Sequence, residues 1–279
     1  MESRKEKIES LMGLSIASYY PCSGGCISDA YVFKTKDEKS YFLKVGSKSE
    51  MYRREEEGLE ELAQATRVPK VFYAEDDFIV MEYIVPGQAK RDTFRNFGRD
   101  LAKLHKYHGD KFGFNANNFI GSTPQINTRM DSWCEFYWQN RLLYQLNLAE
   151  KNNLATKELA EGFAKLEKKI PEILGKQNIA SLLHGDLWSG NYIIDINGDA
   201  WLIDPAVYYG DREAEFGMIT LFGGFNQGFF TGYNEVYPLN EGWEHRNRVY
   251  QLYHLMNHLN LFGRSYFGQV METLKLSLA

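Results

Sequence analysis

Two short segments carry the side chains best suited to chemistry, and a predicted β-hairpin separates them. Residues 184–191 read HGDLWSGN, and residues 203–205 read IDP. Between them, residues 192–195 (YIID) and 200–203 (AWLI) have the β-branched and aromatic composition of strands. Their link, INGD, contains an Asn-Gly pair that readily takes the positive φ values of a tight turn. The hairpin should therefore bring its two ends close together.

Three side chains of these segments can converge on one divalent cation. Asp186 and Asp204 offer carboxylates and Asn191 an amide oxygen, which are the hard ligands that Mg²⁺ prefers. In protein kinases a metal-binding Asn follows the catalytic Asp at the same spacing. The pattern predicts phosphoryl transfer, with Asp186 as catalytic base, Asn191 and Asp204 as metal ligands, and His184 bracing the loop. Taken singly, Asp, Asn and Gly also favour plain turns and caps.

A lysine in the N-terminal part can complete a phosphate site. Lys44 lies in the β run of residues 40–45 (SYFLKV), facing away from its apolar neighbours because strand side chains alternate. The next predicted helix carries glutamates at 55–57, and we expect Glu55 to pair with Lys44 and hold the amine on ATP phosphates. A lone lysine in a strand is more typically a solvated residue.

The segment before this strand is rich in glycine, which lets backbone N–H groups approach phosphate closely. We therefore predict nucleotide contacts from Gly24, Gly25, Cys26, Ile27 and Ser28. A Gly-Gly pair is also typical of an ordinary hairpin turn. A thiol beside phosphate-binding amides can be reactive, so a redox-sensitive dimer through Cys26 is one hypothesis, and a monomer with an inert cysteine is the other.

A second nucleotide contact is expected where the β-rich part of the chain ends. Glu82, Tyr83 and Ile84 precede a Val-Pro-Gly sequence that strongly punctuates the chain. Their backbone is predicted to bind adenine, with the Glu82 carbonyl and the Ile84 N–H as the candidate groups. The competing interpretation is simply the end of a buried strand.

Periodicity divides the chain into a β-rich and a helical part. Expected strands cover 30–35, 40–45, 71–74 and 78–83, and expected helices cover 50–64, 93–105, 130–149, 156–169, 213–230 and the tail from 243. Pro171 is expected to end the fourth helix. We predict an α+β, two-lobed protein-kinase-like fold, with an N-lobe at residues 1–84 and a C-lobe at residues 85–279.

Composition and charge exclude several other classes of protein. The net charge of −5 gives no basic face for nucleic acid. The N-terminus has no signal-peptide apolar region, and the apolar runs are too short to span a membrane. Three cysteines, an odd number, indicate neither a disulfide framework nor a zinc site. We therefore expect a cytoplasmic protein with reduced thiols.

Beyond the catalytic motif, the sequence resembles the fructosamine-3-kinase (ketosamine-3-kinase) family, which is related to aminoglycoside and choline kinases. The matching segments are 24–28, Glu55 with Gly58-Leu59, 104–105, 112–114 through 118–121, 133, 136–137, 141–142, 184–191, 204–213 and 221–225. The resemblance implies ATP- and Mg²⁺-dependent phosphorylation of the 3-hydroxyl of a free or protein-bound ketoamine, followed by release of the amine. It also implies that Asp186, Asn191 and Asp204 act as proposed above.

The same resemblance suggests substrate contacts. The indole of Trp188 offers a face for the C–H surface of a sugar, with packing between the lobes as the alternative. Asp211 and Glu213 are candidates to orient the substrate amine or Arg212, and they are equally suited to cap the helix that follows.

Two other functions remain open at this stage. One is a kinase for an aminoglycoside, choline or another small alcohol, against which the motifs around Trp188 and residues 208–213 argue. The other is a pseudokinase scaffold, which should have lost part of the set that Lys44, Asp186, Asn191 and Asp204 complete.

Overall fold

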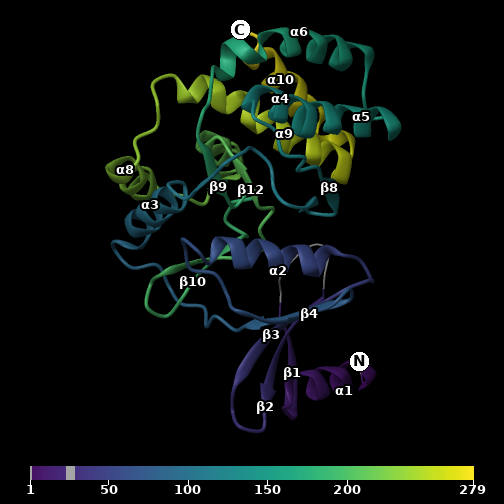
Figure 1. Cartoon of the computed structure of the whole chain (residues 1–279), viewed down its shortest axis with the longest axis vertical. Helices are drawn as coiled ribbons and strands as arrows, with labels where there is room; N and C mark the ends of the chain where they lie inside the picture. The colour runs from purple at the N-terminus through teal and green to yellow at the C-terminus, as the bar shows by residue number, and fades with distance from the viewer. Residues whose placement is uncertain (1, 23–28) are drawn as a thin grey trace.

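The chain folds into a small β-rich lobe and a larger helical lobe, which confirms the predicted protein-kinase-like class (Figure 1). The computed structural model describes residues 2–22 and 29–279. The predicted nucleotide segment at 24–28 lies outside this part of the chain, so its contacts and the role of Cys26 stay predictions.

A five-stranded antiparallel sheet, in the order β1-β2-β3-β5-β4, forms the N-lobe. Its strands are β1 (Ile16–Cys22), β2 (Asp29–Thr35), β3 (Ser40–Val45), β4 (Val71–Ala74) and β5 (Phe78–Glu82). The four predicted strands are confirmed, whereas β1 was not predicted. Its sequence, IASYYPC, has no clean apolar alternation that would indicate a strand. In the structure only Ile16 of its seven residues is buried.

The two faces of this sheet bury different side chains. Leu43 and Val45 of β3 pack with Phe33 and Phe78 beneath α1 (Glu2–Met12), a helix that the sequence did not reveal. The opposite face packs against α2 (Met51–Leu62). Because strand side chains alternate, Lys44 shares this second face and points toward the helix that carries Glu55.

The C-lobe is mainly helical, with short strands between its helices and the N-lobe (Figure 1). Its helices are α3 (Thr93–Leu104), α4 (Trp133–Tyr137), α5 (Tyr144–Lys151), α6 (Lys157–Leu174), α7 (Glu215–Phe222), α8 (Gln227–Val236), α9 (Trp243–Phe262) and α10 (Phe267–Ser277). Its strands are β6 (His108–Gly109), β7 (Asn118–Ile120), β8 (Thr123–Gln125), β9 (Ala180–Leu183), β10 (Tyr192–Ile194), β11 (Ala200–Leu202) and β12 (Tyr208–Gly210).

Three predicted helices differ from the structure in detail. The helix expected at 130–149 contains a π-helical turn, Trp138–Leu143, between α4 and α5. The segment 213–230 divides into α7 and α8, because Gly223 takes a φ of +70° and ends α7. α6 continues past Pro171 to Leu174, since buried Ile170 and Leu174 hold its last turn against the core, and Gly175 terminates it. Among the described helices, none combines the length and apolarity needed to cross a bilayer.

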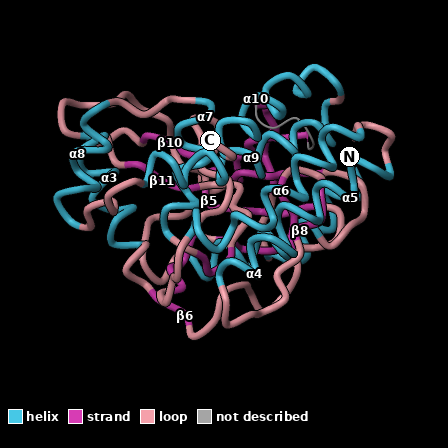
Figure 2. The backbone as a smooth tube through the Cα atoms, turned by 90° about the horizontal axis from the view of Figure 1, so that it is seen from above, coloured by secondary structure: helices cyan, strands magenta, loops and turns pink. Residues whose placement is uncertain are grey.

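Two glycines set the distance between α3 and α8, which lie side by side in both views (Figure 1 and Figure 2). A Cβ at Gly98 would lie 2.0 Å from the Phe229 carbonyl oxygen, and one at Gly232 would lie 1.9 Å from the Arg95 carbonyl oxygen. The helices therefore pack backbone to backbone, and α3 in turn leads directly from the N-lobe.

We expect Gly98→Ala to destabilise the protein by about 1–3 kcal/mol, because the added methyl group must push α8 away. Gly268→Ala is the matched control, since Gly268 of α10 meets nothing within 4 Å. The control should be neutral or stabilising by up to about 1 kcal/mol through helix propensity. Urea unfolding of both variants measures the difference, and equal midpoints would contradict the packing argument.

Candidate active site

The β10–β11 hairpin forms as predicted. Its loop is closed by hydrogen bonds to the Asp195 side chain, and Asn197 does not take the positive φ value that the Asn-Gly pair led us to expect. Tyr192 pairs with Leu202 and Ile194 with Ala200. The Asp195 carboxylate accepts hydrogen bonds from the backbone N–H groups of Asn197 (2.8 Å) and Asp199 (2.9 Å). Gly198 takes a positive φ of +84°, whereas Asn197 does not. The loop is therefore fixed by side-chain hydrogen bonds to backbone N–H groups.

Hydrogen bonds tie the segment before the hairpin to the segment after it. His184 Nε2 donates to the Ile203 carbonyl (2.8 Å), and its Nδ1 accepts from the Asp186 backbone N–H (3.3 Å). The Ala206 N–H donates to the His184 carbonyl, and the Ile203 N–H donates to the Asn191 carbonyl. His184 is fully buried, and burial lowers its pKa, so it stays neutral and braces the loop as expected.

The two segments approach so closely that one position must be glycine. A Cβ on Gly185 would lie 2.1 Å from the Ala206 carbonyl oxygen, and its φ is +85°. Asp204 itself takes a φ of +53°, an uncommon backbone conformation for a residue other than glycine. Such a conformation at a predicted metal ligand is typical of a functional site.

Side chains of the predicted catalytic loop, residues 184–191, contact one another. The Asn191 amide nitrogen donates to the Asp186 backbone carbonyl (2.7 Å) and to its carboxylate (3.1 Å). This leaves the Asn191 amide oxygen as the atom that it can offer to a cation.

The N-lobe completes the set through Lys44. Its ammonium donates to Glu55 at 2.6 Å and also pairs with Asp204 of the C-lobe. The predicted Lys44–Glu55 ion pair is thus present, and Glu56 and Glu57 are not its partners. Burial disfavours the charged form of Lys44, but Asp204 and Glu55 outweigh this effect and raise its pKa. Lys44 therefore keeps its charge where nucleotide phosphates would need it.

These residues border one cavity of about 580 Å³ between the lobes. Its lining includes Lys44, Glu55, Asp186, Trp188, Asn191 and Asp204. The hairpin and the N-lobe sheet thus bring together the predicted base, both predicted metal ligands and the predicted phosphate-binding lysine, although Lys44 and Asp204 are 160 positions apart in the sequence.

The donor set fits a divalent cation. Burial raises the pKa of Asp186 well above its usual range, and the negative charges of Asp204 and Glu215 add to that rise. Burial and Asp204 likewise raise the pKa of Glu55 to about 7. Burial thus disfavours the charged forms of these carboxylates, and the neighbouring negative charges add to the effect. The positive charge of Mg²⁺ held by Asn191 and Asp204 would favour the charged forms.

The residues predicted to bind adenine do not line this cavity. Glu82 ends β5, Tyr83 and Ile84 follow it, and none of the three is in the lining of this cavity. The chain that follows then contacts the β10–β11 hairpin, where the Gly87 N–H donates to the Ile194 carbonyl. Adenine binding by residues 82–84 therefore stays a prediction.

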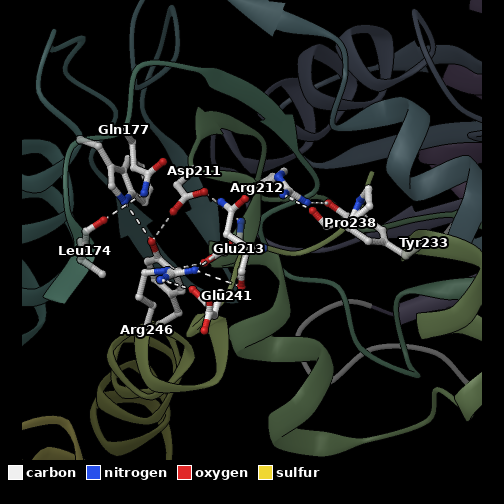
Figure 3. A network of polar contacts seen from close by, with 12 residues as sticks. Leu174, Gln177, Asp211, Arg212, Glu213, Tyr233, Pro238, Glu241 and Arg246 are labelled. Carbon is white, nitrogen blue, oxygen red and sulfur yellow. Dashed lines mark hydrogen bonds and ion pairs between the residues drawn. The ribbon is translucent and has the colours of Figure 1, made fainter. Parts of the chain in front are cut away.

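The expected substrate contacts of Asp211 and Glu213 do not agree with the structure. Both side chains are buried in a polar network away from the cavity lining (Figure 3). Asp211 accepts from Tyr250 and from the Glu213 N–H, and Glu213 forms an ion pair with Arg246 of α9 at 2.6 Å. Asp211 takes the alternative role and caps the short 3₁₀ turn Arg212–Ala214, whereas Glu213 lies within that turn. The contacts of the two side chains with Tyr250 and Arg246 attach the segment before α7 to α9.

A glutamate that the sequence did not single out positions the catalytic loop. Both carboxylate oxygens of buried Glu215 accept backbone N–H groups, from His184 at 2.7 Å and from Gly185 at 3.0 Å. Its position in the first turn of α7 resembles an ordinary acidic helix start, so no sequence signal separates the two roles.

Comparison with solved structures defines the class of protein. The structure superimposes on a candidate fructosamine-3-kinase of Thermobifida fusca with a TM-score of 0.93 and 29% identity, covering 100% of this chain and 99% of that one. The ADP-bound aminoglycoside phosphotransferase APH(2″)-Ib gives a TM-score of 0.65 with 18% identity, covering 98% and 96% of the two chains. The latter likeness shows the fold alone, which is that of a kinase-like phosphotransferase.

Sequence relatives define the family within that class. A protein-ribulosamine 3-kinase of Oryza sativa subsp. japonica, named as chloroplastic, is 40% identical and covers 89% of this chain and 75% of that protein. A probable ketoamine kinase of Enterococcus faecium is 37% identical and covers 91% of this chain and 93% of that protein. The fructosamine kinase family model matches residues 2–279, and the chain belongs to this family.

We expect Glu215→Gln to lower kcat about 10- to 100-fold, because one oxygen becomes an amide group that faces a backbone donor. The KM for ATP should change little, since Lys44 and Glu55 are untouched. Glu244→Gln, on the exposed side of α9, is the control and should match the parent protein. Steady-state kinetics with thermal unfolding tests this role. An unchanged kcat would contradict this role. A lower kcat accompanied by higher KM values for both substrates and a lower Tm would also contradict it, because the whole protein would then be destabilised.

Proposed function

We propose that this protein is an ATP- and Mg²⁺-dependent ketoamine 3-kinase. Its substrates would be fructosamine, ribulosamine or erythrulosamine adducts, which form when sugars glycate amines. The observation that carries the proposal is the convergence of Lys44, Asp186, Asn191 and Asp204 on one cavity in a member of the fructosamine kinase family. The resulting 3-phosphate would make the adduct unstable and release the amine.

The residues of the cavity divide the reaction between them. Asp186, whose raised pKa suits a proton acceptor, would take the proton of the attacking 3-hydroxyl. Asn191 and Asp204 would hold Mg²⁺, which supplies charge neutralisation at the phosphates when bound. Lys44, held by Glu55, would bind phosphate oxygens and orient the γ-phosphoryl group.

The nucleotide would extend from this centre along the N-lobe. We retain the backbone of residues 24–28 as the phosphate contact and residues 82–84 as the adenine contact, with the lobe boundary near residue 85. Support comes from Lys44, which lies on β3 between β2, the strand that follows residues 24–28 in the sequence, and β5, the strand that ends at Glu82. We also retain the cytoplasm as the site of reaction, because the cysteine content fits a reducing compartment.

Trp188 is the proposed contact for the sugar. Trp188 lines the cavity and is 37% exposed, so part of its surface is available to a ligand. The ring folds over Gly190, where a Cβ would lie 2.5 Å from it. Its orientation is therefore fixed by the catalytic loop, two residues from the base.

The alternative functions are less well supported. An aminoglycoside or choline kinase would share the fold, but the solved aminoglycoside phosphotransferase is only 18% identical, whereas the fructosamine kinase family matches residues 2–279. A pseudokinase scaffold would not need Lys44, Asp186, Asn191 and Asp204 to border the same cavity.

We expect Asp186→Asn to lower kcat by about 10²- to 10⁴-fold with little change in the KM for ATP, because the base acts chiefly in the transition state. The assay is Mg²⁺-dependent ADP release with fructosyl-, ribulosyl- and erythrulosyl-lysine. Asp131→Asn, an exposed partner of Lys111, should retain full activity. Full activity of Asp186→Asn would exclude this base, and failure of the parent protein on all three substrates would exclude the proposed function.

We expect Trp188→Ala to raise the KM for the ketoamine about 5- to 10-fold, since the lost apolar contact is worth about 1 kcal/mol. The KM for ATP should stay within a factor of about two, because Lys44 and the N-lobe remain intact. Phe72→Ala on β4, which is similarly exposed and lies outside the cavity lining, is the control and should keep both constants. If Trp188→Ala leaves both constants unchanged, the indole serves packing alone.

A further inference from the structure

The cavity has a second end that the phosphoryl-transfer residues do not use. Beyond Trp188 it is lined by aromatic side chains from the C-terminal ends of α7 and α9 and from the turn after α9. We call this set the aromatic wall. Its members are Trp188, Phe222, His258, Phe262 and Tyr266.

The rings of the aromatic wall form a continuous series. The centroids of Trp188 and Phe222 are 6.4 Å apart, and those of Phe222 and His258 are 4.7 Å apart. His258 then contacts Phe262 at 5.4 Å and Tyr266 at 5.1 Å. The series therefore begins beside the catalytic loop and ends on a different part of the C-lobe.

The aromatic wall also leads to solvent. Phe222 is 37% exposed and Phe262 is 55% exposed, among the more exposed large apolar side chains of the described chain. Exposed rings that line a cavity next to a catalytic base are typical of a binding surface rather than of a core. A ligand lying along them would have one end at Asp186 and the other end at the protein surface.

The wall is aromatic and uncharged. His258 Nδ1 lies 2.8 Å from the His254 carbonyl, which can only accept, so Nδ1 carries a proton and Nε2 does not need one. Burial lowers the pKa of His258 and favours this neutral form. Within the described residues, the basic side chains of the lining are Lys44 and Arg54, which both belong to the N-lobe end. The wall thus offers π faces without a competing cation.

We propose that the aromatic wall binds the amine side of the ketoamine, meaning its protonated nitrogen and the aliphatic chain that the nitrogen carries. Aromatic faces attract ammonium groups and pack against methylene groups, so both parts of such a substituent are complementary to the wall. The open end at Phe262 fits a chain that continues into a larger carrier. The site therefore selects glycated lysine side chains of peptides or proteins over ketoamines of small amines.

This inference rests on the proposed function, and the chemistry of a ketoamine supports the direction of the ligand. The reacting hydroxyl is on C3 of the sugar and the nitrogen is on C1, so the amine substituent must leave the reaction centre close to Asp186. Trp188 lies two residues from that base and is the first ring of the wall. A sugar on the indole thus directs its nitrogen toward Phe222 and His258.

The kinetic test compares one sugar on two amines, the ketoamine of Nα-acetyl-lysine amide and the ketoamine of methylamine. The ratio of kcat/KM for the long to the short substrate should exceed about 10 in the parent protein and fall about tenfold in Phe262→Ala. Phe72→Ala, an exposed phenylalanine of β4, is the matched control and should keep the parent ratio. A parent ratio near one, or a ratio that Phe262→Ala leaves unchanged, would overturn the proposal.

A binding test separates this proposal from the proposed function. Calorimetry measures binding to the aromatic wall without any reaction. The two probes are N-methylhexylammonium and its neutral counterpart, hexyl methyl ether. The ammonium should bind at least about fivefold more tightly than the ether, and Phe262→Ala should abolish that preference. Equal binding of the two probes overturns the wall proposal even if ketoamines are phosphorylated. Selective ammonium binding without ketoamine turnover supports the wall and rejects the kinase assignment.

Discussion

The candidate site depends on one close approach, between the backbone before Asp186 and the backbone after Asp204. Gly185 has no room for a side chain because the Ala206 carbonyl lies where a Cβ would be. Across this contact His184 joins the Asp186 N–H to the Ile203 carbonyl, while Glu215 holds the preceding N–H groups from behind. The predicted base and the predicted metal ligand are therefore positioned mainly by hydrogen bonds to the backbone on either side of them.

A second constraint joins the lobes through charge. Lys44 and Glu55 are largely withdrawn from water, whereas the Asp204 side chain is 35% exposed. Burying a charged pair such as Lys44 and Glu55 costs about as much free energy as their pairing returns. The network is consequently poor evidence for stability. Its effect is to hold Lys44 of the N-lobe next to Asp204 of the C-lobe. A nucleotide accompanied by a cation would satisfy Asp204 with the metal and Lys44 with phosphate, so it can replace their ion pair without leaving either charge unpaired.

The sequence predicted those features that depend on local pattern. Alternation placed Lys44 opposite Leu43 and Val45, and turn residues placed a hairpin between Asp186 and Asp204. Features that depend on tertiary contacts were missed or misassigned. Glu215 resembles a helix cap until its contact with His184 is seen, and Asp211 and Glu213 resemble exposed acids until Tyr250 and Arg246 cover them. Likewise Phe222, Phe262 and Tyr266 have no common sequence signal, since α7 and α9 bring them together only in the fold.

The arrangement separates the part of the cavity that performs the reaction from the part that would choose the substrate. In the proposed roles, Lys44, Asp186, Asn191 and Asp204 would act on any suitably placed hydroxyl, and a fold of this type is also found in the aminoglycoside phosphotransferase APH(2″)-Ib. Selection must then come from groups outside that set. In this chain the helix ends that carry Phe222 and Phe262 belong to the C-lobe and make no part of the phosphate site. They can therefore change with the amine to be recognised while the catalytic loop, fixed by Gly185, stays the same.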